Sequence, residues 1–133
     1  MKKKREQLYK HPDIVISPCD FGHGIFTTRT LPADTTIEEC PYLRINADEC
    51  ARTLDDYVFN LEKADDNGDS DVYSLVLGWG SLFNHSDNHN TEYWHDTDRD
   101  VIVFHTIKEV AAGTQLFVNY GKDWWESRDE MPA

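Results

Sequence analysis

The chain has 133 residues, a length that fits one domain with a sizeable core and excludes a second independent domain. Its apolar fraction of 39% and aromatic fraction of 12% indicate a folded globular protein, and no stretch approaches the roughly 18 apolar residues that a membrane span needs. The formal net charge of -12 argues against direct binding to nucleic acid, because an anionic body repels phosphate backbones.

Short β-rich segments separated by turn residues dominate the chain, and no long helical period occurs in roughly the first hundred residues. The expected strands cover residues 13–17, 24–29, 35–45, 56–60, 72–78, 91–94, 100–107 and 114–120. The segment 72–78 also fits a short buried helix. Pro41 cannot donate a backbone hydrogen bond, so it predicts a bulge or a sheet edge within the third strand. The predicted fold class is therefore mostly β.

Two polar segments interrupt this pattern. Residues 46–60 are expected to hold a short helix or turn before the fourth strand, and "EKADDNGDSD" is expected to be a solvated loop. With Gly68 at the sixth position of an EF-hand loop, the first calcium ligand would fall on Lys63. We therefore expect no calcium site.

The last expected strand, "TQLFVNY", alternates in a way that assigns its two faces. The period of two places Leu116, Val118 and Tyr120 on one face and Phe117 and Asn119 on the other. The first face is the one expected to pack on the core. The ring of Tyr120 is therefore predicted to point inward.

The two ends of the chain differ from its body. Residues 1–10 hold five basic side chains and one acidic one, which leaves eight basic against 24 acidic side chains elsewhere. Such a body suits a Lys/Arg-rich peptide as a partner, although acidity that serves only solubility explains the charge equally well. After Gly121 a polar tail carries Trp124 and Trp125, and two exposed tryptophans are costly. The tail is therefore expected to fold back.

Cysteine usage and the N-terminus indicate the compartment. Cys19, Cys40 and Cys50 are odd in number and widely spaced, so they predict neither a disulfide framework nor a cysteine zinc site. The opening "MKKKREQLYKHPD" has no apolar segment behind its basic residues and does not resemble a secretory signal. We expect an intracellular protein, cytoplasmic or, in a eukaryotic host, nuclear. The sequon that begins at Asn84 is accordingly not taken as a glycosylation site.

Three short motifs could carry chemistry. Gly22 and Gly24 flank one residue just before a strand, where glycine lets the backbone approach a ligand closely. Asn84 and His85 end an apolar run and offer both donors and acceptors. Tyr120 ends the last expected strand, and a buried phenol needs a hydrogen-bond partner. Each motif alone has an ordinary structural interpretation: a turn, a capped turn with a core histidine, and a structural tyrosine.

Taken in order, the motifs resemble those of the SET-domain protein lysine methyltransferases, most closely the small viral members that contain little more than the catalytic core. The resemblance runs from about residue 13 to residue 128, including "SPCDFGHGIF", "LDDYVF", "LGWGSLFNHSDNHN", "FHTIKEVAAGTQLFVNYG" and "DWWESR". It implies small twisted sheets with a C-terminal pseudoknot, in which the end of the chain passes through an earlier loop. The expected domain covers 13–128, after a basic extension (1–12) and before a tail (129–133).

The resemblance also implies roles for individual residues. The residues expected to bind S-adenosylmethionine are Gly22, His23, Gly24, Asn84, His85, Trp124 and Trp125. Tyr120 is expected to lie beside the transferred methyl group, and Tyr57 to line the channel for the substrate lysine. No metal is expected, because a methyl group on a sulfonium is already activated and the protein need only align and desolvate the amine.

The sequence departs from the family pattern at several places. His89 stands where a proline commonly precedes the final asparagine of the motif, here Asn90, which puts the rigidity of that loop in doubt. His23 stands where many relatives carry an aromatic residue. The flanking cysteine-rich zinc segments of many relatives are absent, so closure of the site would fall to the tryptophan tail or to a second subunit of a homodimer.

Two other functions compete with the methyltransferase. A metal hydrolase could use His85, Asp87, His89 and His95, but His85 and His89 would share a face only on a helix, and this region has the composition of a turn. A non-catalytic SET-like module that binds basic peptides or a protein partner fits the acidic surface equally well. The intact Tyr120 favours an enzyme acting on a basic protein tail or on a nucleic-acid-binding protein.

Overall fold

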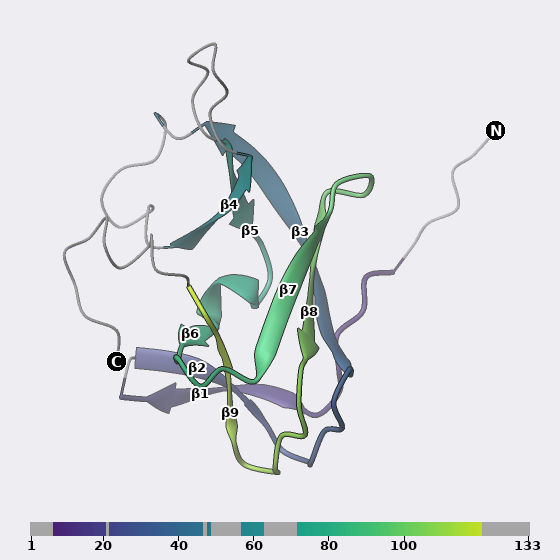
Figure 1. The fold of residues 1–133 in the computed structure, drawn as a ribbon, viewed down its shortest axis with the longest axis vertical. Coiled ribbons are helices and arrows are strands. Elements are labelled where there is room, and N and C mark those ends of the chain that lie inside the picture. The colour runs from purple at the N-terminus through teal and green to yellow at the C-terminus, as the bar shows by residue number, and fades with distance from the viewer. Residues whose placement is uncertain (1–6, 21, 47, 49–56, 63–71, 121–133) are drawn as a thin grey trace.

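The computed structural model describes residues 7–20, 22–46, 48, 57–62 and 72–120. The strands within these ranges form two sheets, a four-stranded one in the order β1-β2-β9-β6 and a five-stranded one in the order β4-β5-β3-β8-β7 (Figure 1). The elements are β1 (Ile14–Cys19), β2 (Gly22–Thr27), β3 (Thr36–Asn46), β4 (Val58–Glu62), β5 (Val72–Val76), the 3-10 helix η3 (Gly80–Leu82), β6 (Asn84–His85), β7 (Thr91–Asp96), β8 (Val101–Thr106) and β9 (Gln115–Val118).

The mostly β prediction is confirmed, and most expected strands occur close to their predicted positions. The segment 72–78 forms a strand that ends at Val76, and not a helix. Gly78 follows with a φ of +78°, a left-handed conformation that favours glycine and turns the chain out of the sheet. The chain then enters η3, which leads directly into β6.

β3 is the longest strand and has two partners in succession. It pairs with β8 from Thr36 to Pro41 and with β5 from Tyr42 to Asn46. The prediction that Pro41 marks a bulge or an edge is wrong, because β3 lies inside its sheet and the irregularity falls between Thr36 and Glu38. Pro41 lies where one ladder gives way to the other. Proline lacks a backbone N–H, and here it lies where the pairing with β8 ends and the pairing with β5 begins.

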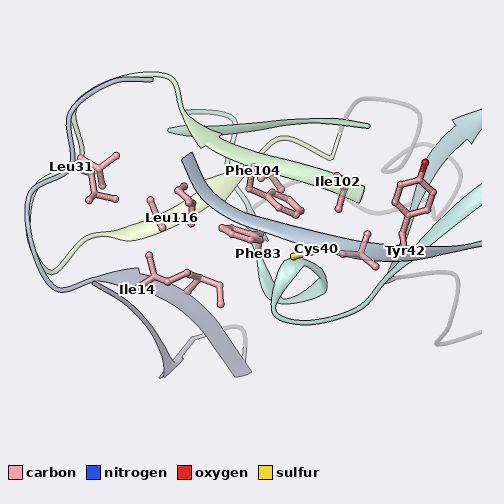
Figure 2. Packing of buried hydrophobic residues seen from close by; sticks show 13 residues of the cluster. Ile14, Leu31, Cys40, Tyr42, Phe83, Ile102, Phe104 and Leu116 are labelled. Carbon is pink, nitrogen blue, oxygen red and sulfur yellow. The ribbon is translucent and has the colours of Figure 1, made fainter. Parts of the chain in front are cut away.

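The core joins the two sheets through apolar side chains. Figure 2 shows Phe83 and Phe104 face to face at its centre, between Leu116 and Cys40. The rings of Phe83 and Phe104 stack with their centroids 4.4 Å apart. Burying each large apolar side chain stabilises the fold by about 1.5–3 kcal/mol. The core therefore fixes Phe83, the residue that immediately precedes β6.

The predicted inward face of the last strand is confirmed. Leu116 and Val118 are fully buried, and the ring of Tyr120 packs against the edge of the same cluster. β9 lies between β2, with which it pairs antiparallel, and β6, with which it pairs parallel. This central position brings the end of the described chain to both the glycine turn and the Asn84–His85 pair.

Several predictions fall on residues outside the described ranges. These are the course of the tail with its two tryptophans, the predicted loop over 62–71 except for Glu62, which ends β4, the short helix before β4, and Cys50. In the part of the chain that the structure describes, Cys19 and Cys40 are free thiols. No helix within that part is long and apolar enough to cross a membrane.

Candidate active site

The glycine turn brings the start of β2 close to β6 and β9. Gly22 has a φ of +98°, which L side chains rarely adopt. Gly24 is buried, and a Cβ there would clash with Oε1 of Gln115 and lie 3.0 Å from Nδ2 of Asn84. The first glycine is therefore required by backbone conformation and the second by close packing.

Asn84 ties this turn to the other two segments. Its Nδ2 donates to the carbonyl oxygen of His23 at 3.0 Å and to Oε1 of Gln115 at 2.9 Å. Because a backbone carbonyl can only accept, the contact with His23 fixes which end of the amide faces β2. Oδ1 of Asn84 consequently faces the other way, as an acceptor.

His85 is buried, and its two ring nitrogens have distinct roles. Nδ1 accepts from the backbone N–H of Tyr120 at 2.9 Å, so in the neutral ring the proton is on Nε2. Nε2 lies 2.9 Å from Oδ1 of Asp87 and donates to it. The tautomer of His85 is thus set by one contact to Tyr120 and one to Asp87.

Tyr120 lies against the same pair. Its ring centroid is 5.2 Å from that of His85, and its hydroxyl donates to the carbonyl oxygen of Phe83 at 2.9 Å. The residue is half-buried, so one side of the ring packs on the core and the other reaches the surface. The phenol oxygen is therefore held at a fixed position next to the Asn84–His85 pair.

Asn90 fixes β9 through its side chain. It is buried, its Oδ1 accepts from the N–H of Phe117 at 2.8 Å, and its Nδ2 donates to the carbonyl of Gln115 at 3.0 Å. Its backbone N–H also donates to the carbonyl of Phe117 at 3.2 Å. The loop that carries His89 in place of a proline is thus tied to β9 at its end.

The structure brings most of the predicted site residues together. Gly22, His23, Gly24, Asn84, His85 and Tyr120 converge where β2, β6 and β9 meet. Tyr57 is exposed, and its carbonyl accepts from the hydroxyl of Ser81 in η3 at 3.4 Å. Its predicted place in a lysine channel stays a prediction. Trp124 and Trp125 lie outside the described residues.

Three contributors were not predicted. They are the side chain of Gln115, the carbonyl of Phe83 and the carboxylate of Asp87. For Gln115, the sequence offered one indication of a role in the site: it is a polar residue at the start of an otherwise apolar strand. The other two depend on contacts between segments, which no local pattern reveals.

The histidines proposed for a metal hydrolase have separate partners. His85 contacts Asp87, His89 lies 3.4 Å from Glu92, and the ring of His95 lies 2.9 Å from the hydroxyl of Ser74. Burial, assisted by the charge of Arg44, lowers the pKa of His95. Within the described ranges no three potential ligands gather into a metal-binding group. The geometry therefore gives the hydrolase no support.

Comparisons with known proteins identify the family to which this chain is similar. The sequence profile of the family described as "SET domain" matches residues 22–121. A histone-lysine N-methyltransferase of Schizosaccharomyces pombe, described as specific for lysine 37 of histone H3, is 30% identical over 110 residues, which cover 78% of this chain and 69% of the relative. The crystal structure of a Plasmodium falciparum protein, described as a histone methyltransferase, superposes with a TM-score of 0.66 at 27% identity, over 86% of this chain and 98% of the other.

Proposed function

The chain belongs to the SET-domain family and is a protein-lysine methyltransferase, and from this premise we propose that the convergence of β2, β6 and β9 forms its methyl-transfer site. The observation that carries the proposal is the pair of hydrogen bonds that link Asn84 to His23 and His85 to Tyr120. These residues are 61 and 35 positions apart in the sequence. Their convergence supports one shared ligand.

SET methyltransferases use S-adenosylmethionine as the methyl donor, and the residues of this site fit it. Gly22 is exposed, and a Cβ there would meet nothing within 4 Å, so a ligand can approach the backbone. Oδ1 of Asn84 offers an acceptor suited to an ammonium group. The backbone of Gly22–Gly24 together with Asn84 and His85 would hold the cofactor, which supplies a methyl group on a positively charged sulfur.

Tyr120 is the proposed catalytic residue. Its hydroxyl hydrogen is donated to Phe83, so its oxygen meets a substrate amine as an acceptor. An acceptor at this place orients the amine lone pair toward the methyl group. A free lysine amine has a pKa of about 10.4, and a dry site next to a cation lowers that pKa, which favours the neutral nucleophile. The proton leaves to solvent before transfer.

The proposed substrate is a lysine in a basic protein segment. Beyond residue 10 the chain holds eight basic and 24 acidic side chains, so it attracts cationic peptides and repels nucleic acid. The fission-yeast relative is described as acting on a histone, which supports a histone-like substrate and an intracellular, including nuclear, location. Tyr57 in the lysine channel, Trp124 or Trp125 over the cofactor, and a homodimer that closes the site are parts of the same proposal.

Transfer from labelled S-adenosylmethionine to a panel of basic proteins, histone H3 included, tests the proposal. Tyr120→Phe is expected to lower the rate about 100-fold, a loss typical of removing one preorganised polar contact, while cofactor binding changes little. Tyr93→Phe, a part-buried tyrosine of the other sheet, is the matched control and should keep the wild-type rate. Wild-type transfer by Tyr120→Phe would remove the proposed role, and cofactor binding without transfer to any protein would favour a non-catalytic module.

A further inference from the structure

The segment that precedes β1 lies along β3, outside the part of the chain that matches the family profile. The N–H of His11 donates to the carbonyl of Ile37 at 2.7 Å, and the N–H of Glu39 donates to the carbonyl of Tyr9 at 2.8 Å. Figure 1 shows this segment, in purple, running beside β3 before it enters β1. Residues 9–11 are therefore docked on the five-stranded sheet.

Lys10 extends from this segment to the aromatic ring of Trp79. Its Nζ lies 2.8 Å from the centroid of the indole, over the face of the ring. A cation over a tryptophan is attracted by about 0.5–1 kcal/mol at an exposed site and by more when water is excluded. Trp79 is the residue that immediately precedes η3.

A buried carboxylate holds the same turn from the inside. Glu38, which is only 4% exposed, accepts from the N–H of Trp79 at 3.2 Å and from Sγ of Cys40 at 2.6 Å, both through Oε1. Burial raises the pKa of Glu38, whereas its hydrogen bonds and the charge of Lys10 act in the opposite direction. Burial also raises the pKa of Cys40, so its thiol stays protonated and donates.

The turn at Trp79 leads straight into the site. Its carbonyl accepts from the N–H of Leu82 at 2.9 Å, which closes η3. Phe83 follows, and its carbonyl receives the hydroxyl of Tyr120. Asn84, the first residue of β6, comes next. A displacement of Trp79 would therefore be passed through three residues of η3 and Phe83 to the cofactor-binding pair.

We propose that Lys10 is a positioning residue for the cofactor site: it clamps Trp79 against the turn that Glu38 holds, and so fixes the direction in which η3 and β6 leave the five-stranded sheet. The inference rests on the proposed cofactor site. It makes the N-terminal segment part of the functional unit. A lysine that only stabilised the fold would lower the melting temperature and leave the folded site unchanged.

Three lysine variants test the inference, with the affinity for S-adenosylmethionine measured well below each melting temperature. Lys10→Met keeps the aliphatic stem and removes the charge, and is expected to raise Kd about two- to fivefold, the range that a cation–π contact covers. Lys10→Arg keeps a cation that stacks on indole and should stay within about twofold of wild type. Lys3→Met removes the same charge from the basic N-terminus and should leave Kd unchanged.

Two further measurements separate positioning from stability. In Trp79→Leu, adding Lys10→Met should cause no additional loss of affinity, because the partner of the ammonium is already gone. Without cofactor, the amide NMR signals of residues 80–86 should shift in Lys10→Met and stay in place in Lys3→Met. A lower melting temperature with unchanged Kd and unchanged signals would overturn the inference. If the wild-type protein bound no cofactor while the signals did shift, the proposed function would fail and the clamp on the turn would stand.

Discussion

The two sheets share one apolar core but differ in the polar contacts that fix their strands. The five-stranded sheet contributes β3 and β8, whose buried residues include Ile102 and Phe104 and are held mainly by apolar packing. The four-stranded sheet contains two short strands, β6 with two residues and β9 with four. Polar side chains fix them: Asn84 donates a hydrogen bond to the backbone of β2, and Asn90 donates one to the backbone of β9. Truncating an apolar core residue of β8 should therefore act mainly on stability, whereas changing these polar side chains should also act on activity.

The largest effect on stability is expected from Ile102→Ala. Ile102 is fully buried in β8, away from the hydrogen bonds of the site, and truncating such a residue costs about 2–5 kcal/mol. The free energy of unfolding from urea titration should fall by this amount, while the methyl-transfer rate per folded molecule stays near wild type. Leu43→Ala, an exposed leucine on β3, should change stability by less than about 0.5 kcal/mol. Equal losses in the two variants would contradict the view that burial of apolar side chains stabilises this sheet.

Asn90→Ala should affect both properties. It leaves the N–H of Phe117 and the carbonyl of Gln115 without their side-chain partners in a buried place, at a cost of about 2–4 kcal/mol. Because β9 ends two residues before Tyr120 and positions it, the transfer rate should fall even when the protein is fully folded. The control is Asn88→Ala, an exposed asparagine of the same loop. Unfolding in urea measures stability, and transfer at saturating substrates measures activity. A transfer rate equal to that of the control would show that the position of β9 does not affect the site.

Gly24→Ala should act mainly on cofactor affinity. The added methyl group would displace the side chain of Gln115 and crowd Nδ2 of Asn84, and overpacking of this kind costs about 1–3 kcal/mol. The Kd for S-adenosylmethionine, measured by calorimetric titration, should rise about tenfold, which corresponds to about 1.4 kcal/mol. Gln115→Ala removes the same contact to Asn84 without a clash and should give a smaller rise. Unchanged affinity in both variants would mean that the orientation of Asn84 does not matter.

The smallest effect is a change in the pH dependence of stability in Glu38→Gln. Burial raises the folded-state pKa of Glu38 above 4.5, so its contribution to stability is fully present below pH 4.5 and is lost as the pH rises through the higher folded value. Gln keeps the acceptor oxygen and does not titrate. The melting temperature of the variant minus that of wild type should therefore increase as the pH rises through this window. Glu109→Gln, which removes one carboxylate from an exposed position, is the matched control.

Features that depend on neighbouring residues could be predicted from the sequence. The alternation of Leu116, Val118 and Tyr120 assigned the inward face of β9 because a strand has a period of two. The two partners of β3, the parallel pairing of β6 with β9 and the contact of Lys10 with Trp79 could not be predicted, because each joins segments far apart in the chain. Roles for Asn84 and His85 came from the family resemblance, since their spacing alone is equally typical of a capped turn.

The central place of β9 has a consequence for the newly made protein. Among the described strands it is the last to be synthesised, yet it separates β2 from β6 in the finished sheet. On the ribosome, a nascent chain that ends before Gln115 already contains the glycine turn and the Asn84–His85 pair, but it lacks the strand that pairs with both β2 and β6. Under the proposed role of Tyr120, methyl transfer has to wait until translation has passed this residue, and a prematurely terminated product would carry most of the sequence motifs without enzymatic activity.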